Sequence, residues 1–212
     1  MVYRLGTTLP VDEVPDGFNL LVSGPPMTGK YELLLRILLS SCDNVVVVST
    51  KNSDERIRED VADISSETVE LGVVDTVSRQ RNLETLSEDT QTKYVSSPEN
   101  LTQMGVKFTV LFDHFYENQP DERTGVGIHS VSHLLMYSDV KAVYQFLQVI
   151  TGKVQSADWL GVATLDSTVH DDQTMNMLQN HFDAVVETRR SEGERQLRVV
   201  GLGPEATDWT PF

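Results

Sequence analysis

The chain has 212 residues, 39% of them hydrophobic and 7% aromatic, which is enough for one sizeable α/β core and short for two. Its formal net charge is −15, so its field repels nucleic-acid phosphates and disfavours a DNA recombinase. Its single cysteine, Cys42, excludes an internal disulfide and a cysteine-based metal site, and we expect a buried structural thiol.

No apolar run approaches the roughly 20 residues that span a bilayer, so we expect no membrane insertion. The N-terminus lacks both an apolar signal core and an Arg-rich amphipathic stretch, so we expect a cytoplasmic location. No linker that would split the chain is visible, so we expect a single domain over residues 1–212. Two interpretations of the acidity stay open. It is either an ordinary acidic surface or an adaptation to high salt, as in a halophilic source, where screening removes the repulsion.

Strand and helix patterns alternate along the chain, which predicts a mostly parallel sheet flanked by helices. Residues 78–92 are charged and poor in large apolar side chains, so we expect a mobile surface loop there. The elements expected before that loop are a strand at Phe18–Ser23, a helix at Tyr31–Ser41, a doubly buried strand at Asn44–Thr50, a weakly helical segment at Ser53–Ile64 and a strand at Val69–Asp75.

The segment Asn100–Glu117 fits two patterns. Its FTVLFD run, Phe108–Asp113, has the shape of a Walker B strand that ends in an acid. The longer window is periodic at three- and four-residue steps, which favours a helix and places Asp113 away from the phosphates. The apolar residues that carry this period are Leu101, Met104, Phe108, Leu111, Phe112 and Phe115.

The remaining elements continue the alternation and end in an antiparallel pair. Gly193 lies in RRSEGE, a sequence that signals a β-hairpin turn, and the terminal Thr207–Phe212 is expected to dock on the body. The expected elements are a strand at Val126–Ser130, a helix at Asp139–Thr151, a strand at Leu160–Leu165, a helix at Asp171–Phe182 and hairpin strands at Ala184–Thr188 and Gln196–Val200.

A phosphate-binding motif, G-x-x-x-x-G-K, lies between the first expected strand and the first expected helix, which is the context this motif requires. Glycines let the backbone turn tightly toward a phosphate, and the lysine places a positive charge beside it. The helix that begins there adds its N-terminal dipole. The nucleotide-binding residues predicted here are Gly24, Pro25, Pro26, Met27, Thr28, Gly29, Lys30 and the following Tyr31.

With this loop placed, the order of elements resembles the RecA superfamily of P-loop ATPases, in its KaiC-like/RadA-like branch. It is most similar there to the short single-domain KaiC-like proteins of halophilic archaea. The resemblance covers nearly the whole chain and implies a RecA-type P-loop NTPase core with a C-terminal β-hairpin, ATP or ADP as ligand and often a hexamer. The segments that carry it are Gly24–Lys30, Leu101–Tyr116, His129–Val154, Trp159–Thr174 and Thr207–Phe212.

Three positions that carry the mechanism in this family depart from its pattern. Tyr31 replaces the Ser or Thr whose hydroxyl binds Mg²⁺, so either the metal is held through water or its binding is weakened or lost. His129 stands where relatives have the Walker B acid, and a neutral imidazole suits Mg²⁺ poorly. Thr50 and Lys51 stand where relatives have a catalytic Glu pair.

Other candidate site residues are weaker. Lys51 could offset phosphate charge in place of Mg²⁺, although a solvated loop lysine is the simpler interpretation. Arg189 and Arg190 on the hairpin could contact the nucleotide of a neighbouring subunit, as basic residues do in the family, or be ordinary surface arginines. The histidines lack HExxH spacing, and we predict no metal site.

The sequence therefore predicts a nucleotide-binding or pseudo-ATPase regulatory protein that acts through protein contacts, for example in signal transduction. The alternatives are an active KaiC-like ATPase, which could associate with DNA, and an interaction module that has lost nucleotide binding. Protein partners and a homo-oligomer fit the first interpretation, and nucleic acid is disfavoured by the charge. Hexamer, dimer and monomer stay open.

Overall fold

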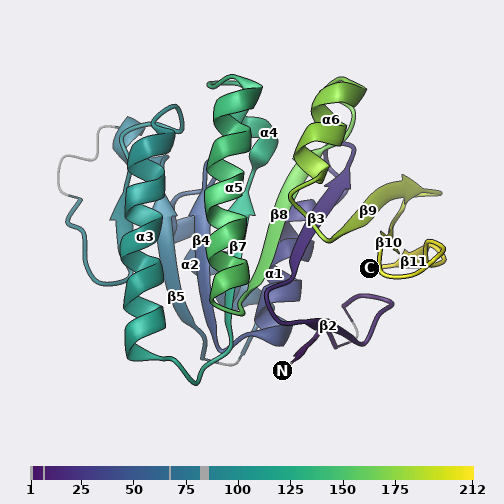
Figure 1. Ribbon diagram of the computed structural model, residues 1–212, viewed down its shortest axis with the longest axis horizontal. Helices are drawn as coiled ribbons and strands as arrows, with labels where there is room; N and C mark the ends of the chain where they lie inside the picture. Colours follow the sequence, from purple (N-terminus) through teal and green to yellow (C-terminus); the bar gives the residue numbers. More distant parts are fainter. Residues whose placement is uncertain (1, 7, 67, 82–85) are drawn as a thin grey trace.

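The computed structural model describes residues 2–6, 8–66, 68–81 and 86–212 (Figure 1). The strands within these residues are β1 (Val2–Arg4), β2 (Glu13–Pro15), β3 (Asn19–Gly24), β4 (Asn44–Ser49), β5 (Glu70–Asp75), β6 (Thr92–Tyr94), β7 (Thr124–His129), β8 (Leu160–Asp166), β9 (Ala184–Ser191), β10 (Glu194–Val200) and β11 (Thr210–Pro211). The helices are α1 (Lys30–Ser41), α2 (Asp54–Ile64), a 3-10 turn η1 (Ser78–Arg81), α3 (Leu101–Asn118), α4 (Val131–Leu134), α5 (Val140–Ser156) and α6 (Asp172–Gln179).

In the described part of the chain, nine strands form one sheet in the order β11-β10-β9-β3-β8-β7-β4-β5-β6. The strands from β9 to β6 are parallel, and β10 and β11 extend one edge as antiparallel strands. The ends of neighbouring parallel strands coincide, since Gly24 is paired with Asp166 and Ser49 with His129. This register gathers the carboxyl ends of β3, β8, β7 and β4 at one edge of the sheet.

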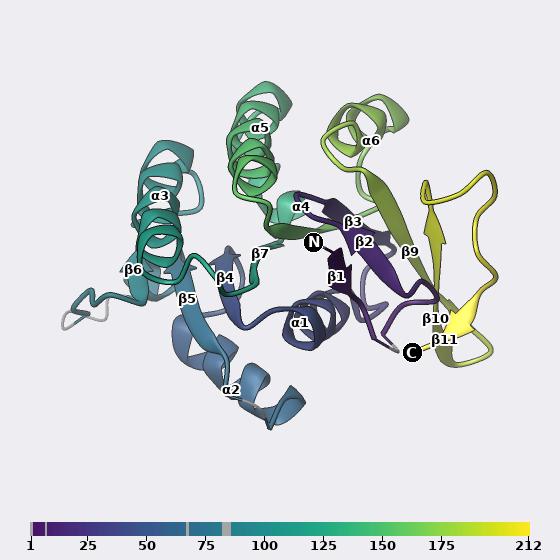
Figure 2. The ribbon, with the colours of Figure 1, turned by 60° about the horizontal axis from the view of Figure 1, so that its bottom comes forward.

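Helices cover both faces of the sheet (Figure 2). The helices α3, α5 and α6 lie on one face, and α1 and α2 lie on the other (Figures 1 and 2). All six residues of β4 are buried, as expected of a strand covered on both faces. One apolar cluster forms around α1 and the other around α3 and α5, with the sheet between them. The predicted α/β class, mostly parallel with a C-terminal hairpin, is confirmed.

The ambiguous segment before β7 is helical, as its period predicted. α3 buries Met104, Phe108, Leu111, Phe112 and Phe115. Asp113 lies on the outer face of this helix, where its carboxylate is 54% exposed and 4.0 Å from the Lys153 ammonium. The carboxyl end of β7 is instead occupied by His129.

The short elements β1, β2, β6, α4 and β11 were not predicted, because two to four residues show no period. The predicted loop at 78–92 differs at both ends, since Ser78–Arg81 forms η1 and Thr92 begins β6. Its mobility stays a prediction, and residues 82–85 lie outside the described residues.

The C-terminal hairpin and tail form as the sequence indicated. Glu192 and Gly193 both have positive φ, 52° and 88°, which suits a tight two-residue turn. The tail strand β11 pairs with β10, and the Trp209 ring lies 4.0 Å from the Arg189 guanidinium. Cys42 is buried, as predicted, and burial raises the pKa of its thiol.

Candidate functional site

The predicted phosphate loop, Gly24–Lys30, connects the carboxyl end of β3 to the start of α1. Met27 and Gly29 have positive φ values of 64° and 85°, which fold the loop back toward the helix. No side chain hydrogen-bonds to cap the N-terminus of α1. Its first amide groups and its dipole therefore favour an anion at this position.

Strand β9 packs against the phosphate loop from one side. A Cβ atom at Gly24 would collide with the hydroxyl and carbonyl oxygens of Thr188, so only glycine fits between the two strands here. The Thr188 hydroxyl lies 2.7 Å from the Thr28 hydroxyl, and Thr28 also donates to the Pro25 carbonyl oxygen at 2.9 Å. The loop is thus held by a hydrogen bond within it, from Thr28, and by the contact of Thr28 with Thr188 of β9.

Lys30 is turned inward and is only 8% exposed. Its ammonium donates to the carbonyl oxygens of Gly24 and Pro25 at 2.9 and 2.6 Å, and it lies 2.8 Å from the Asp166 carboxylate. Burial lowers the pKa of Lys30, and the hydrogen bond that Lys30 donates to Asp166 acts in the opposite direction. Asp166, at the end of β8, was not among the residues predicted from the sequence.

A cleft of about 320 Å³ opens above this lysine at the carboxyl edge of the sheet. The structure brings Tyr31, Lys51 and His129 together around it, so the three departures from the family pattern share one site. We call it the phosphate-loop cleft; its lining residues are Met27, Gly29, Lys30, Tyr31, Glu32, Lys51, His129, Ser130, Thr164 and Asp166.

Tyr31 points toward α2 rather than toward the loop. Its hydroxyl donates to the Asp60 carboxylate at 3.0 Å, and its ring centroid lies 4.3 Å from that of His129. Burial raises the pKa of the phenol. The Tyr31 hydroxyl is therefore engaged with α2. It does not replace the Ser or Thr hydroxyl that the motif places on Mg²⁺.

His129 is neutral and nearly enclosed, with 8% of its surface exposed. Burial, followed by the charge of Lys51, lowers its pKa to about 3. Its Nδ1 lies 3.3 Å from the Thr164 hydroxyl. Because it carries no negative charge, it does not fit the role of an acid that orders water on Mg²⁺.

The two residues that follow β4 have different surroundings: Thr50 joins two strands, and Lys51 faces the cleft. The Thr50 hydroxyl accepts from the Ser130 amide at 2.9 Å and donates to the His129 carbonyl oxygen at 3.1 Å, so it links β4 to β7. Lys51 is exposed and faces the cleft. Neither can abstract a proton from water as a carboxylate would.

The hairpin arginine beside the phosphate loop is Arg195, which was not among the residues predicted from the sequence. Its Nη1 would lie 2.5 Å from a Cβ atom at Gly29, and it pairs with the Glu32 carboxylate at 2.7 Å. Arg189 instead stacks on Trp209, and Arg190 is exposed. Contacts of these two arginines with a neighbouring subunit stay a prediction. Only the pairing of β10 with β9 brings Arg195 here, so the sequence carries no local signal for it.

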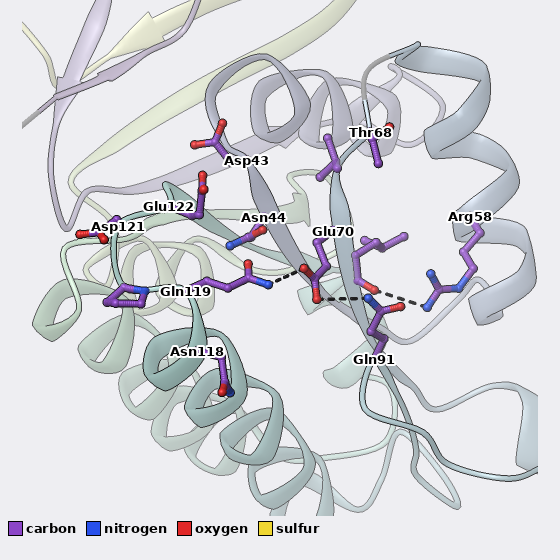
Figure 3. Close-up of a pocket in the computed structure, with 13 residues that line it drawn as sticks. Asp43, Asn44, Arg58, Thr68, Glu70, Gln91, Asn118, Gln119, Asp121 and Glu122 are labelled. Carbon is purple, nitrogen blue, oxygen red and sulfur yellow. Dashed lines mark hydrogen bonds between the residues drawn. The ribbon is translucent and has the colours of Figure 1, made fainter.

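A larger pocket, of about 940 Å³, lies at the opposite edge of the sheet, near the amino ends of β4 and β5 (Figure 3). Its central Glu70 accepts hydrogen bonds from Gln91 at 3.2 Å and from Gln119, and Arg58 donates to the Leu71 carbonyl oxygen at 3.4 Å (Figure 3). These polar groups satisfy one another. The pocket also lacks the uncapped helix N-terminus of the phosphate loop, so the phosphate-loop cleft is the stronger candidate.

Two absences hold for the described part of the chain. No three His, Cys, Asp or Glu side chains come together in it to hold a metal ion. Within the same residues, no helix has the length and apolar character needed to cross a membrane.

Comparisons with known proteins agree with the geometry at the level of the fold. A model described as "Family of unknown function (DUF7504)" matches residues 17–188. No curated protein matches the chain. The flagellar accessory protein FlaH from Methanocaldococcus jannaschii is similar in structure, with a TM-score of 0.53 and 11% identity over 95% of this chain and 88% of that one. The likeness supports the predicted RecA-type fold. The finer assignment to KaiC-like haloarchaeal proteins stays a prediction.

Proposed function

The chain belongs to the DUF7504 family, and we propose that it is a RecA-like protein that binds ATP or ADP and hydrolyses ATP little or not at all. One observation carries the proposal. The phosphate loop retains its strand, its glycines and Lys30, whereas Tyr31, His129 and Lys51 line the same cleft, at positions where the resemblance implies hydrolytic groups.

Binding draws on positive charge at the floor and the rim of the cleft. Lys30, the uncapped N-terminus of α1 and the exposed Lys51 favour the phosphates of a nucleotide. Pro25 and Pro26 have no amide hydrogen to donate, so the loop offers fewer donors than its length suggests. We therefore expect binding of modest affinity.

Hydrolysis lacks its usual groups. The side chains at the three altered positions do not fit Mg²⁺ and supply no carboxylate to activate water. Each such group typically lowers the activation free energy by a few kcal/mol, and about 1.4 kcal/mol corresponds to a tenfold change in rate. Turnover in the isolated protein is therefore expected at or near the uncatalysed background.

Replacing Lys30 with methionine is expected to weaken nucleotide binding about 10- to 100-fold, the value of a charge-assisted hydrogen bond of roughly 1.5–3 kcal/mol. Isothermal titration with ADP and ATP, with and without Mg²⁺, measures the affinity, and phosphate release measures turnover. Lys141→Met, at an exposed position on α5, removes the same charge away from the cleft and is the matched control.

The outcomes separate the alternative functions. Binding without turnover supports the proposal. Mg²⁺-dependent turnover would show an active ATPase with unusual ligands. No binding by the wild-type chain would identify an interaction module that keeps only the fold. Lys51→Ala with unchanged affinity would remove the idea that Lys51 offsets phosphate charge.

A groove between α3 and α5 supports the proposal that the protein acts through contacts with other proteins. It holds about 550 Å³ and is lined mostly by apolar and small side chains. Val106, Val110 and Val149 are 58%, 46% and 53% exposed there. Exposed apolar surface of this kind is typical of sites of protein interaction. We propose that a protein partner binds this groove and responds to the nucleotide-bound state.

A further inference from the structure

Resting on the proposed function, we infer that Asp166 is a built-in lock on the phosphate loop. Its carboxylate holds the Lys30 ammonium in place of a phosphate, and a nucleotide must displace this carboxylate in order to bind. Asp166 thereby lowers the affinity of the site for phosphate groups, although it is neither in the loop nor at one of the positions altered from the family pattern.

The hydrogen-bonding capacity of Lys30 is fully used. A lysine ammonium has three N–H donors. Its three partners are the carbonyl oxygens of Gly24 and Pro25, at 2.9 and 2.6 Å, and the carboxylate of Asp166, at 2.8 Å. A phosphate oxygen that approaches Lys30 finds no spare donor, so one of the three contacts must break.

The ion pair is well shielded from solvent. The Lys30 side chain is 8% exposed and that of Asp166 is 16% exposed. Charges this sheltered attract one another more strongly than an exposed pair does, because water screens them less. This attraction offsets part of the desolvation that lowers the pKa of Lys30.

The backbone of Asp166 is fixed at the position from which the carboxylate reaches the loop. Asp166 is paired with Gly24 in the sheet register, and the next amide, that of Ser167, donates to the Gly24 carbonyl oxygen at 2.9 Å. The Asp166 amide donates to the Ser132 hydroxyl at 2.8 Å, and that hydroxyl also lies 2.8 Å from Nε2 of His170. The contact with Lys30 is thus set by the strand pairing of β3 and β8.

The carboxylate is the contact that yields. The two carbonyl oxygens belong to the loop backbone and keep their positions unless the loop refolds. The carboxylate is attached through two side-chain torsions and borders the cleft, so it can rotate away. Once a phosphate has reached Lys30, two anions lie near one ammonium, and their repulsion lowers the affinity for nucleotide without a bound cation.

Asp166→Asn tests the lock, because it keeps the shape and removes the charge. We expect this variant to bind ADP and inorganic tripolyphosphate about tenfold more tightly than the wild type in EDTA, a change of ~1.4 kcal/mol. Both ligands are expected to gain equally, since the competition concerns phosphate alone. Titration calorimetry at low ionic strength measures both. Asp113→Asn, an exposed acid on α3, is the control for the change in net charge.

Other results would overturn the inference in distinguishable ways. If the wild type binds ADP and Asp166→Asn binds it no more tightly, the lock fails and the proposed function stands. If the variant loses Mg²⁺-dependent affinity and is otherwise unchanged, Asp166 is a metal ligand and not a lock. If neither protein binds any phosphate ligand, both proposals fail. Asp166→Ser, checked for folding by circular dichroism, carries the same expectation should the amide variant be unstable.

Discussion

Replacing Gly24 with alanine is expected to destabilise the fold by about 3 kcal/mol, the upper part of the range for overpacking a close contact. The cause is steric, because the new methyl group would collide with both the side chain and the backbone carbonyl oxygen of Thr188. A flexible side-chain tip could move aside, but a carbonyl in the middle of β9 cannot do so without separating two paired strands. Chemical denaturation of the variant and the wild type measures the loss.

The matched control for this substitution is Gly105→Ala in α3. A Cβ atom there meets nothing within 4 Å, and alanine favours a helix over glycine by up to about 1 kcal/mol. We expect Gly105→Ala to be neutral or stabilising. Equal effects of the two substitutions would show that the close approach of β3 and β9 is not what requires glycine at the start of the phosphate loop.

Acidification from pH 7 to pH 5 is expected to cost the wild type about 2 kcal/mol of stability through His129 alone. Burial lowers the pKa of this imidazole to about 3 in the folded chain. In the unfolded chain it takes up a proton near pH 6.5. Between these two values the unfolded state binds more protons, so stability falls as the pH falls. The penalty fades as the pH rises above 6.5 and stops growing below about pH 3.

His129→Gln removes this titration, and its free energy of unfolding should decline less between pH 7 and pH 5. The charged groups around His129 are Lys51, Asp166 and Lys30, and burial also lowers the pKa of the neighbouring His133. The pKa values of His170 and His181 are lowered as well, so a smaller slope of the same sign remains in the variant. Urea unfolding at several pH values checks the difference. Identical slopes would show that His129 is not held neutral by the fold.

The long elements could be predicted because each carries its own pattern. The period of α3 was sufficient to overrule the local FTVLFD run, and the helix buries all five apolar side chains from Met104 to Phe115 that the period selected. The VVVV run predicted a doubly buried strand, and β4 is one. Short elements such as β6 escaped, because three residues cannot show a period and pairing alone decides them.

The sequence by itself determined the α/β class and indicated the place of the phosphate loop. Both depend on motif spacing and hydrophobic period, which are local properties of the chain. The three altered positions follow from the resemblance to the RecA superfamily. Only the tertiary structure decided what surrounds Lys30. Asp166 lies 136 positions beyond Lys30 in the sequence and Arg195 lies 165 beyond it, and both reach the loop through strand pairing. A contact between distant residues leaves no mark in either segment, because it is set by which strands become neighbours in the sheet.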